Sequence, residues 1–223
     1  MEFVQTYEQF LNNLNEGVHD PSIFRAIFLA GGPGSGKSYV VSKVTAGLGY
    51  KVVNSDDMYT HELKKAGLDT TPEDIFSPKG QKIRAHAKDL TDKLLINYIK
   101  GRLGLIIDGT GKDFNKIKEQ SDFLKSLGYE TSMIFVNTSL EVALERNQRR
   151  SRTLDPAIVE KSWRDVQDNI GKFQNYFGFN NFIVIDNNNT KDSVFNKVWK
   201  QVRNISNKPV RNKIADKWIK KNS

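Results

Sequence analysis

Residues 31–38, with the sequence GGPGSGKS, constrain the fold of this chain more than any other segment. They match the pattern G-x-x-x-x-G-K-[ST] in full, after a short apolar run and before a segment with helical character. Glycines allow successive backbone N–H groups to turn inward around a phosphate, and the N-terminus of the following helix adds its positive end. The segment therefore predicts a phosphate-binding loop between a buried strand and a helix.

Each residue type in this loop has an expected role toward a nucleoside triphosphate. Lys37 would reach the β- and γ-phosphates, and the hydroxyl of Ser38 would bind Mg²⁺. The other residues expected to contact the nucleotide are Gly32, Pro33, Gly34, Ser35, Gly36 and Tyr39. The predicted cofactors are therefore ATP and Mg²⁺.

Short apolar runs alternate with helical segments along most of the chain. The apolar runs predict strands in residues 25–32, 50–54, 103–111, 130–137 and 181–187. Helices are expected in residues 3–14, 37–46, 77–102, 115–127, 140–150, 156–173 and 193–205, and another from about residue 58. Near-continuous apolar strands that alternate with helices are typical of an α/β fold, in which helices cover both faces of a parallel sheet.

The positive charge of the chain is concentrated near its C-terminus. The net charge is +8, and residues 191–223 contain ten Lys or Arg and two Asp, which accounts for all of it. We expect an N-terminal helix within residues 1–20, one phosphate-binding domain in residues 21–205 and a basic tail in residues 206–223. The tail could attract phosphate backbones or simply form a solvated helix face.

Composition also limits the compartment. The chain has no cysteine, and no apolar run approaches the roughly 18 to 20 residues that span a bilayer. We therefore expect a soluble, cytoplasmic protein that does not bind membranes.

Several classes of protein share the phosphate-binding loop. The sequence contains neither the N-K-x-D segment with which GTPases recognise guanine nor the L-S-G-G-Q signature of transport ATPases, and mechanical ATPases are larger. A compact kinase remains, which would transfer the γ-phosphoryl group of ATP to an alcohol.

Carboxylates follow two of the predicted strands. Asp56 and Asp57, in VVNSDDMY, follow the second strand, and Asp108 follows the third. Ligands of parallel sheets bind beyond the carboxyl ends of the strands, so these side chains are expected at the same edge as the phosphate-binding loop. One of Asp56 and Asp57 would act on the attacking hydroxyl, while the other caps the helix expected near Met58 or binds indirectly. Ser55 is another possible cap of this helix. Asp108 could bind Mg²⁺ through a water molecule.

Four arginines, Arg146, Arg149, Arg150 and Arg152, occur within seven positions between two predicted helices. Small kinases close mobile lids whose arginines neutralise charge on the transferred phosphoryl group. A surface helix with ion pairs is the alternative, because Glu145 and Arg149 are four residues apart. We expect a lid at about residues 146–156.

Aromatic residues are frequent near the end of the helix expected after the lid. They are Trp163, Phe173, Tyr176, Phe177 and Phe179. Such residues can stack on bases, but at this density they more often pack in the core and at helix ends.

Taken together, these motifs resemble the polynucleotide 5′-hydroxyl kinase domain and the related zeta-toxin kinases. GGPGSGKS, NSDDMY, IIDGTG and RNQRRSRTLDP follow the order and approximate spacing of that family over about residues 25–187. The resemblance implies a P-loop NTPase three-layer sandwich with a helical lid. Its five-stranded parallel sheet would have the order 2-3-1-4-5, with helices on both faces.

The resemblance also implies roles for individual residues. Asp56 would be the general base, and Arg150 would contact the transferred phosphoryl group. We expect Arg152, from the same lid, to close over the transfer together with Arg150. Ser38 and Asp108 are the expected metal ligands. The residues expected to bind the acceptor substrate are Asp57, Asp108, Thr110, Lys112 and Arg146.

The acceptor is the least defined part of this prediction. Polynucleotide kinases place a substrate-binding arginine shortly after the Asp pair, where this chain has Tyr59, Thr60 and His61. We expect transfer to a hydroxyl of a nucleic-acid end or a nucleotide, which would be the partner besides ATP. The alternatives are a zeta-toxin-like kinase of a UDP-sugar, a kinase of a hydroxylated base in DNA, and an ATPase module that acts through its basic tail.

Overall fold

A five-stranded parallel sheet organises the computed structural model, which describes residues 20–149, 153–189 and 192–223. The strands are β1 (Arg25–Ala30), β2 (Lys51–Val53), β3 (Leu105–Ile107), β4 (Glu130–Asn137) and β5 (Phe182–Asp186). Their order is β2-β3-β1-β4-β5, and every pairing is parallel. The predicted order and fold class are confirmed.

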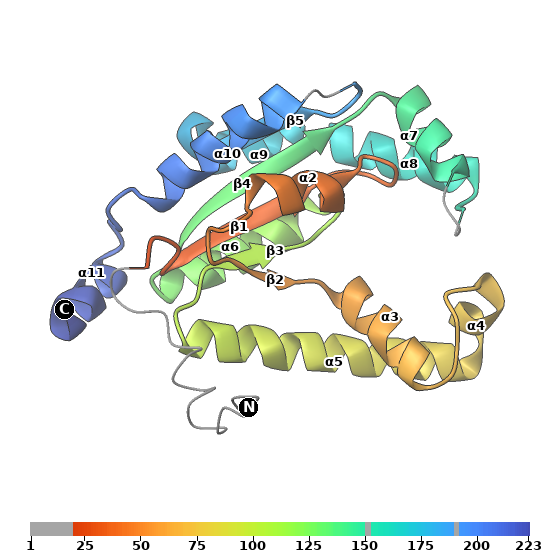
Figure 1. Cartoon of the computed structure of the whole chain (residues 1–223), viewed down its shortest axis with the longest axis horizontal. Coiled ribbons are helices and arrows are strands. Elements are labelled where there is room, and N and C mark those ends of the chain that lie inside the picture. The colour runs from red at the N-terminus through yellow and green to blue at the C-terminus, as the bar shows by residue number, and fades with distance from the viewer. Residues whose placement is uncertain (1–19, 150–152, 190–191) are drawn as a thin grey trace, which may run out of the picture.

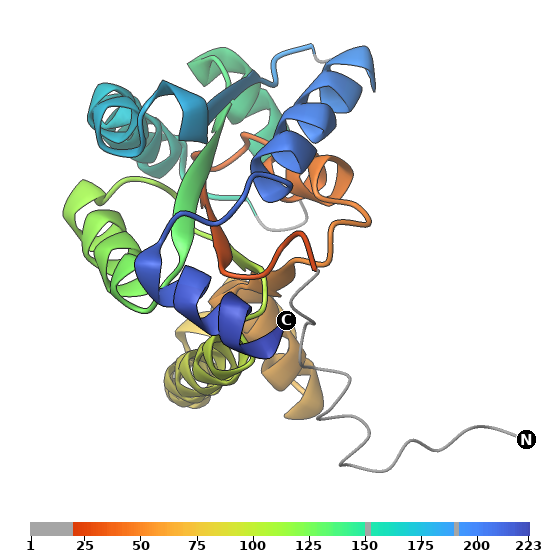
Figure 2. The same ribbon diagram turned by 90° about the vertical axis from the view of Figure 1, so that its left-hand side faces the viewer.

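Helices cover both faces of the sheet, as Figure 1 shows. One face packs against α5 (Pro78–Lys100), α6 (Phe114–Ser126), α8 (Pro156–Gln167), α9 (Ile170–Phe177) and α11 (Lys213–Asn222). The other packs against α2 (Lys37–Val44) and α10 (Asp192–Ser206). Figure 2 shows α6 and α9 on one side of the sheet and α2 and α10 on the other.

The central strand β1 shows why this sheet has no polar face. All six of its residues are buried. Phe28 belongs to the core on the α6 and α9 face, while Ile27 and Leu29 belong to the core on the α2 and α10 face. Since successive side chains of a strand point to opposite faces, burial on both faces requires an apolar residue at nearly every position.

A smaller apolar cluster joins α3 (Ser55–Lys65) and α4 (Pro72–Phe76) to the long helix α5. Tyr59 and Leu63 of α3 pack there with Ile75 and Ala87. Ser77 caps α5 by accepting a hydrogen bond from the N–H of Gly80. The short helix α4 was not predicted. The cluster fixes the position of α3, whose first turn carries Asp56 and Asp57.

Two predicted helices differ from the structure. The helix expected from about Met58 begins at Ser55, because Asn54 is its N-cap. The single helix expected in residues 156–173 is divided into α8 and α9 at Asn169, whose buried side chain donates hydrogen bonds to the carbonyls of Gly111 and Lys112. The break therefore places the amide of Asn169 against the loop that follows β3.

The expected basic tail is a packed part of the domain. Residues 213–222 form α11, in which Ala215 is fully buried, and Trp218 and Ile219 pack on the same core as Phe24 and Tyr129. The lysines of α11 are exposed. Residues beyond the expected boundary at 205 therefore pack on the same core as the sheet.

The N-terminal helix expected within residues 1–20 lies outside the described residues, except for Asp20. In the part of the chain that the structure describes, none of the helices has the length and apolar character needed to cross a membrane.

Candidate active site

The phosphate-binding loop connects β1 to α2 at the carboxyl edge of the sheet. Gly34 and Gly36 have φ angles of +78° and +74°, which favour glycine. At Gly34 a side chain would also overlap the carbonyl oxygen of Ala143. Lys37 begins α2, and the N–H of Gly31 donates to the carbonyl of Thr110 over 2.9 Å. The loop is therefore held against the segment that follows β3.

A cavity of about 750 Å³ lies over this loop. Residues 31–39 line it, together with Asn54, Asp56, Asp57, Asp108, Thr110 and Leu154. Among the described residues, the Ser35 hydroxyl is one of only two buried side-chain groups without a hydrogen-bond partner. The left-handed glycines, the helix N-terminus and this unpaired hydroxyl fit a bound phosphate.

Lys37, Asp108 and Asn54 form a continuous polar chain across the cavity. The ammonium of Lys37 pairs with Oδ1 of Asp108. Oδ2 of Asp108 accepts a hydrogen bond of 2.8 Å from Nδ2 of Asn54. Oδ1 of Asn54 in turn accepts hydrogen bonds from the backbone N–H groups of Asp56 and Asp57, over 2.8 and 3.4 Å. One amide side chain thereby connects the ends of β2 and β3.

Sequence reasoning missed Asn54 and assigned the cap of α3 to one of its neighbours. The expectation that one of Asp56 and Asp57 caps this helix was wrong, since the side chain of Asn54 does so. The available signal was an asparagine directly after the second strand and before Ser-Asp-Asp, a typical N-cap arrangement. Both carboxylates are left in the first turn of α3, facing the cavity over the phosphate-binding loop.

The two carboxylates differ in their surroundings. Burial raises the pKa of Asp57 above its usual value of 3.8, and the charges of Asp108 and Asp56 raise this pKa further. Lys37 and a hydrogen bond from Asn54 act in the opposite direction. A carboxyl group with a raised pKa is more basic, which is a property useful in proton transfer.

A second cavity of about 630 Å³ lies between the end of β3, α5 and α6. Asp108 and Thr110 line both this cavity and the one over the phosphate-binding loop, whereas Lys112 lines only the second. Lys88 and Lys116 bring further positive charge from the two helices. The two cavities therefore meet at the segment that follows β3.

That segment is held in place by Asn169, a second residue that sequence reasoning missed. Its Nδ2 donates to the carbonyls of Gly111 and Lys112 over 3.1 and 2.9 Å. Gly111 has a φ angle of +84°, and a side chain there would approach Cβ of Ala30 to 2.6 Å. The glycine thus allows the segment to pass close to β1.

Arg146 lies behind the phosphate-binding loop and does not join the two aspartates of α3. Its Nη2 donates to the carbonyls of Asn187 and Asn188 over 2.7 and 3.2 Å. Its Nη1 lies 3.5 Å from the carbonyls of Gly34 and Ser35. The expected grouping of Arg146 with Asp57 on the acceptor side is therefore not observed.

A third cavity of about 440 Å³ adjoins Arg146, on the outer side of the loop. Tyr39 and Phe195 form part of its wall, with their ring centroids 5.7 Å apart. Asn187, which sequence reasoning also missed, donates from Nδ2 to the carbonyl of Ser35 over 2.7 Å. The wall thus combines an aromatic ring with amide groups.

The expected lid is described in part. Nδ2 of Asn147 donates to the carbonyl of Leu154 over 2.8 Å, and its Oδ1 accepts from the N–H of Leu154 over 3.0 Å. Arg149 pairs with Glu145, as the alternative interpretation of this helix, α7 (Leu140–Gln148), expected. Arg150 and Arg152 lie outside the described residues. Asn147 is only 2% exposed, and its two hydrogen bonds attach Leu154 to the end of α7.

A magnesium site here would depend on few protein ligands. Within the described ranges, no three His, Cys, Asp or Glu side chains gather in a way that could hold a metal ion. Ser38 and Asp108 both line the cavity over the phosphate-binding loop and offer oxygen ligands. This small set fits Mg²⁺, which usually binds one or two protein oxygens together with waters and substrate phosphates.

Comparison with known proteins identifies the family and the fold of the chain. The profile of the AAA domain family (AAA_33) matches residues 27–172. Adenylate kinase isoenzyme 1 of Sus scrofa is 24% identical over 130 residues, which make up 58% of this chain. The match covers 66% of that relative, slightly less than two thirds of its length.

Two solved structures show a similar fold. A chain of the Pnkp1/Rnl/Hen1 RNA repair complex superposes with a TM-score of 0.52 and 19% identity, covering 67% of this chain and 46% of that one. A gluconokinase from Sinorhizobium meliloti 1021 superposes with a TM-score of 0.51 and 14% identity, covering 82% of this chain and 94% of that one. The fold is that of P-loop kinases.

Proposed function

The chain belongs to the AAA domain family, and from this premise we propose that it is a kinase that transfers the γ-phosphoryl group of ATP to a hydroxyl of a nucleic-acid end or a nucleotide. The observation that carries the proposal is the meeting of two cavities at Asp108 and Thr110. One cavity lies over the phosphate-binding loop and suits the triphosphate. The other opens beside it and suits a second substrate.

The nucleotide would be held by the loop and by α2. Lys37 would exchange its ion pair with Asp108 for the β- and γ-phosphates, and the backbone N–H groups of Gly32 and of residues 34–38 would surround them. Mg²⁺, held by Ser38, Asp108 and the phosphates, would neutralise charge on the transferred group. Tyr39 and Arg146 border the neighbouring cavity, where an aromatic ring and amide groups could receive the base.

The acceptor hydroxyl would meet the γ-phosphorus between Asp56 and the phosphate-binding loop. Its oxygen forms a bond to phosphorus while the bond between phosphorus and the oxygen of the leaving ADP breaks. The carboxylate of Asp56 takes the hydroxyl proton, and Arg150 with Arg152 stabilises the charge on the transferred group. Asp57, with its raised pKa, would orient the acceptor or serve as an alternative base.

Three lysines of the second cavity could hold a phosphate of the acceptor. Lys88, Lys112 and Lys116 line it from three different elements with exposed side chains, beside the carboxylates of Asp92, Asp108 and Asp113. Lysine is a common phosphate ligand because its ammonium presents three donors and a full charge. Nucleotides and nucleic-acid ends carry phosphate close to a free hydroxyl, and this supports them as acceptors.

The test is phosphoryl transfer from γ-labelled ATP to a panel of acceptors. We expect label on 5′-hydroxyl oligonucleotides or on nucleotides, and none on unphosphorylated nucleosides. Label on UDP-sugars alone would replace the proposed acceptor with the zeta-toxin type. Release of labelled phosphate without any labelled acceptor would overturn the kinase assignment.

A lysine substitution makes the test more specific. Lys112→Gln should raise the KM for a phosphate-bearing acceptor by about tenfold, because one charged contact is lost. The matched control is Lys64→Gln, an exposed lysine on α3 that lines neither cavity. An equal KM in both variants would remove Lys112 from the acceptor site.

A further inference from the structure

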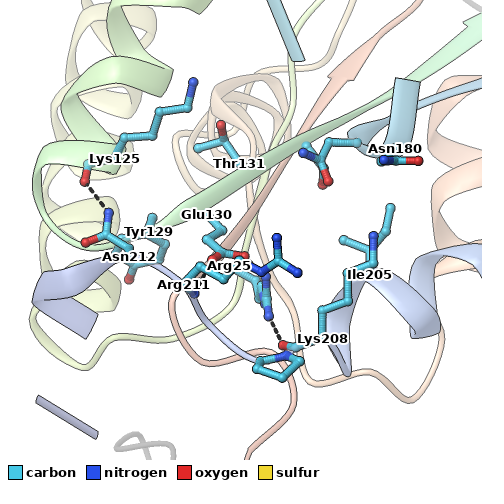
Figure 3. Close-up of a pocket in the computed structure, with 13 residues that line it drawn as sticks. Arg25, Lys125, Tyr129, Glu130, Thr131, Asn180, Ile205, Lys208, Arg211 and Asn212 are labelled. Atoms are coloured by element: carbon cyan, nitrogen blue, oxygen red, sulfur yellow. Dashed lines mark hydrogen bonds and ion pairs between the residues drawn. The ribbon is translucent and has the colours of Figure 1, made fainter. Parts of the chain in front are cut away.

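A cavity of about 570 Å³ lies at the opposite end of the sheet from the candidate active site. Arg25 begins β1 and Glu130 begins β4, and both line this cavity. The candidate active site lies where the strands end, so the two sites are separated by the length of the sheet. Figure 3 shows the side chains of Arg25, Lys208 and Arg211 gathered in this cavity.

Positive charge dominates the wall of the cavity. Arg25, Lys125, Lys208 and Arg211 contribute four cations, and Glu130 is the acidic residue among the lining side chains. Arg25 is 3% exposed and pairs with Glu130, while its Nε is buried without a hydrogen-bond partner. Arg25 therefore already neutralises Glu130, and the other three cations give the cavity wall a net positive charge.

Two of these cations are available to a ligand. Lys125 donates to the hydroxyl of Tyr176, whereas the side chains of Lys208 and Arg211 are exposed and form no ion pair within the described ranges. The backbone holds these two residues in place, because the carbonyl of Lys208 accepts from Arg25 and the N–H of Arg211 donates to Glu130. The charged groups of Lys208 and Arg211 are thus available to a ligand, while their backbone positions are fixed.

Neutral groups beside these cations suit a nucleotide unit. Asn180 and Asn181 line the cavity from a short 3-10 turn, residues Phe179–Asn181. Phe179 begins that turn and is 81% exposed, whereas Phe173 and Phe177 just before it are buried. Phe179 does not itself line the cavity, but it directly precedes Asn180 in this turn. Proteins that bind single-stranded nucleic acid combine exposed aromatic rings with a positively charged groove.

The charge extends beyond the cavity. Lys213, Lys217 and Lys221 are exposed on α11, as is Lys220, which pairs with Asp216 of the same helix. A small anion would need only the cavity, whereas a polyanion would use the whole row. Six of the ten Lys and Arg of residues 191–223 belong to the cavity or to α11, namely Lys208, Arg211, Lys213, Lys217, Lys220 and Lys221.

We propose that this face is a binding site for single-stranded nucleic acid, with a phosphate between Lys208 and Arg211 and a base stacked on Phe179. The site is separate from the candidate active site and does not depend on the proposed reaction. Binding at this face would keep a nucleic-acid strand on the protein while the reaction takes place in the candidate active site.

The test is equilibrium binding of a fluorescent single-stranded oligonucleotide to the full chain, without ATP, at several salt concentrations. The variant Lys208→Glu/Arg211→Glu should weaken binding about tenfold or more at 0.1 M salt. It should also make the slope of log K against log salt less steep by about 0.7, since the two residues together neutralise one single-strand phosphate. Phe179→Ala should weaken binding at least about fivefold with little change in slope.

Lys64→Glu/Lys82→Glu is the matched control. It changes the net charge equally through exposed lysines of α3 and α5 that form no ion pair in the described part of the chain. Thermal unfolding of every variant verifies the fold. Absent binding, or equal loss in both charge-reversed variants, overturns the proposal. Preferential binding to vesicles containing phosphatidylserine, with no affinity for the oligonucleotide, overturns it in favour of a membrane surface.

Discussion

The ammonium of Lys37 and the carboxylate of Asp108 form an ion pair across the candidate nucleotide cavity. Both side chains are largely shielded from water, with 14% and 12% of their surface exposed. A carboxylate thus stands where a phosphate would otherwise pair with the lysine. Asp108 neutralises Lys37 in the nucleotide-free protein, and ATP would have to replace this contact.

Asp108→Asn should therefore lower the stability of the free protein. The substitution keeps the shape of the side chain but leaves the shielded ammonium of Lys37 without a counter-charge. We expect the free energy of unfolding to fall by about 1 to 3 kcal/mol, measured by urea denaturation. An unchanged urea midpoint would show that the ion pair contributes nothing.

Asp56→Asn should abolish phosphoryl transfer and leave ATP binding nearly intact. The amide cannot accept the hydroxyl proton, so kcat should fall by about 10² to 10⁴. Affinity for ATP, measured by calorimetry, should change by less than about threefold, because the phosphate contacts come from the loop. Asp57→Asn is the companion variant, and a larger loss in that variant would transfer the role of base to Asp57.

Asp57→Asn should also stabilise the free protein at neutral pH. The pKa of Asp57 is raised in the folded state, chiefly by burial, so the ionised carboxylate costs stability above that pKa. The folded protein binds the proton more tightly than the unfolded chain, and the cost disappears as the pH falls to the unfolded value of 3.8. Because the group is mostly solvated, we expect a gain of only a few tenths of a kcal/mol. Thermal unfolding at pH 7 and pH 3.5 measures it, and a gain of equal size at both values would contradict this cause.

Local pattern was sufficient to locate the strands. β4 spans Glu130–Asn137, the same residues as the predicted strand ETSMIFVN, whose apolar centre MIFV is buried. The phosphate-binding loop was equally predictable, since its glycines and lysine occur at fixed spacing. The strand order came from the family resemblance.

Side chains that connect distant segments could not be predicted in this way. Asn54, Asn169 and Asn187 bond to groups 54, 58 and 152 residues away in the sequence, and their amides look like ordinary loop residues until the fold places them. The packing of α11 was missed for the same reason. Its apolar residues lie among lysines, and only the partner across the core, Phe24, shows that they are buried.

Asn147→Asp should weaken the closure of the segment between α7 and α8. Asn147 both donates to and accepts from the backbone of Leu154, and a carboxylate of the same shape would place negative charge against that carbonyl. We expect a loss of about 1 to 3 kcal/mol in the free energy of unfolding. Limited proteolysis should cut this segment faster than in a Glu145→Gln control, which removes only an exposed ion pair. Equal cleavage rates would show that Asn147 does not hold the segment.

Trp218→Ala should destabilise the whole domain although it lies in the last ten residues of the chain. The Trp218 ring packs edge-on against Phe24, with centroids 5.7 Å apart, and the guanidinium of Arg102 lies 4.8 Å from it. Since Phe24 immediately precedes β1, loss of the ring opens the core beneath the sheet. We expect a cost of about 2 to 4 kcal/mol in urea denaturation. Lys217→Ala, an exposed neighbour on the same helix, should cost less than about 0.5 kcal/mol. If residues 206–223 were a detached basic tail, both substitutions would be neutral, so equal and negligible effects would refute the packed helix.

A chain truncated after residue 212 should unfold at a still lower urea concentration. For this reason charge reversal on the surface, and not truncation, is the suitable probe of nucleic-acid binding.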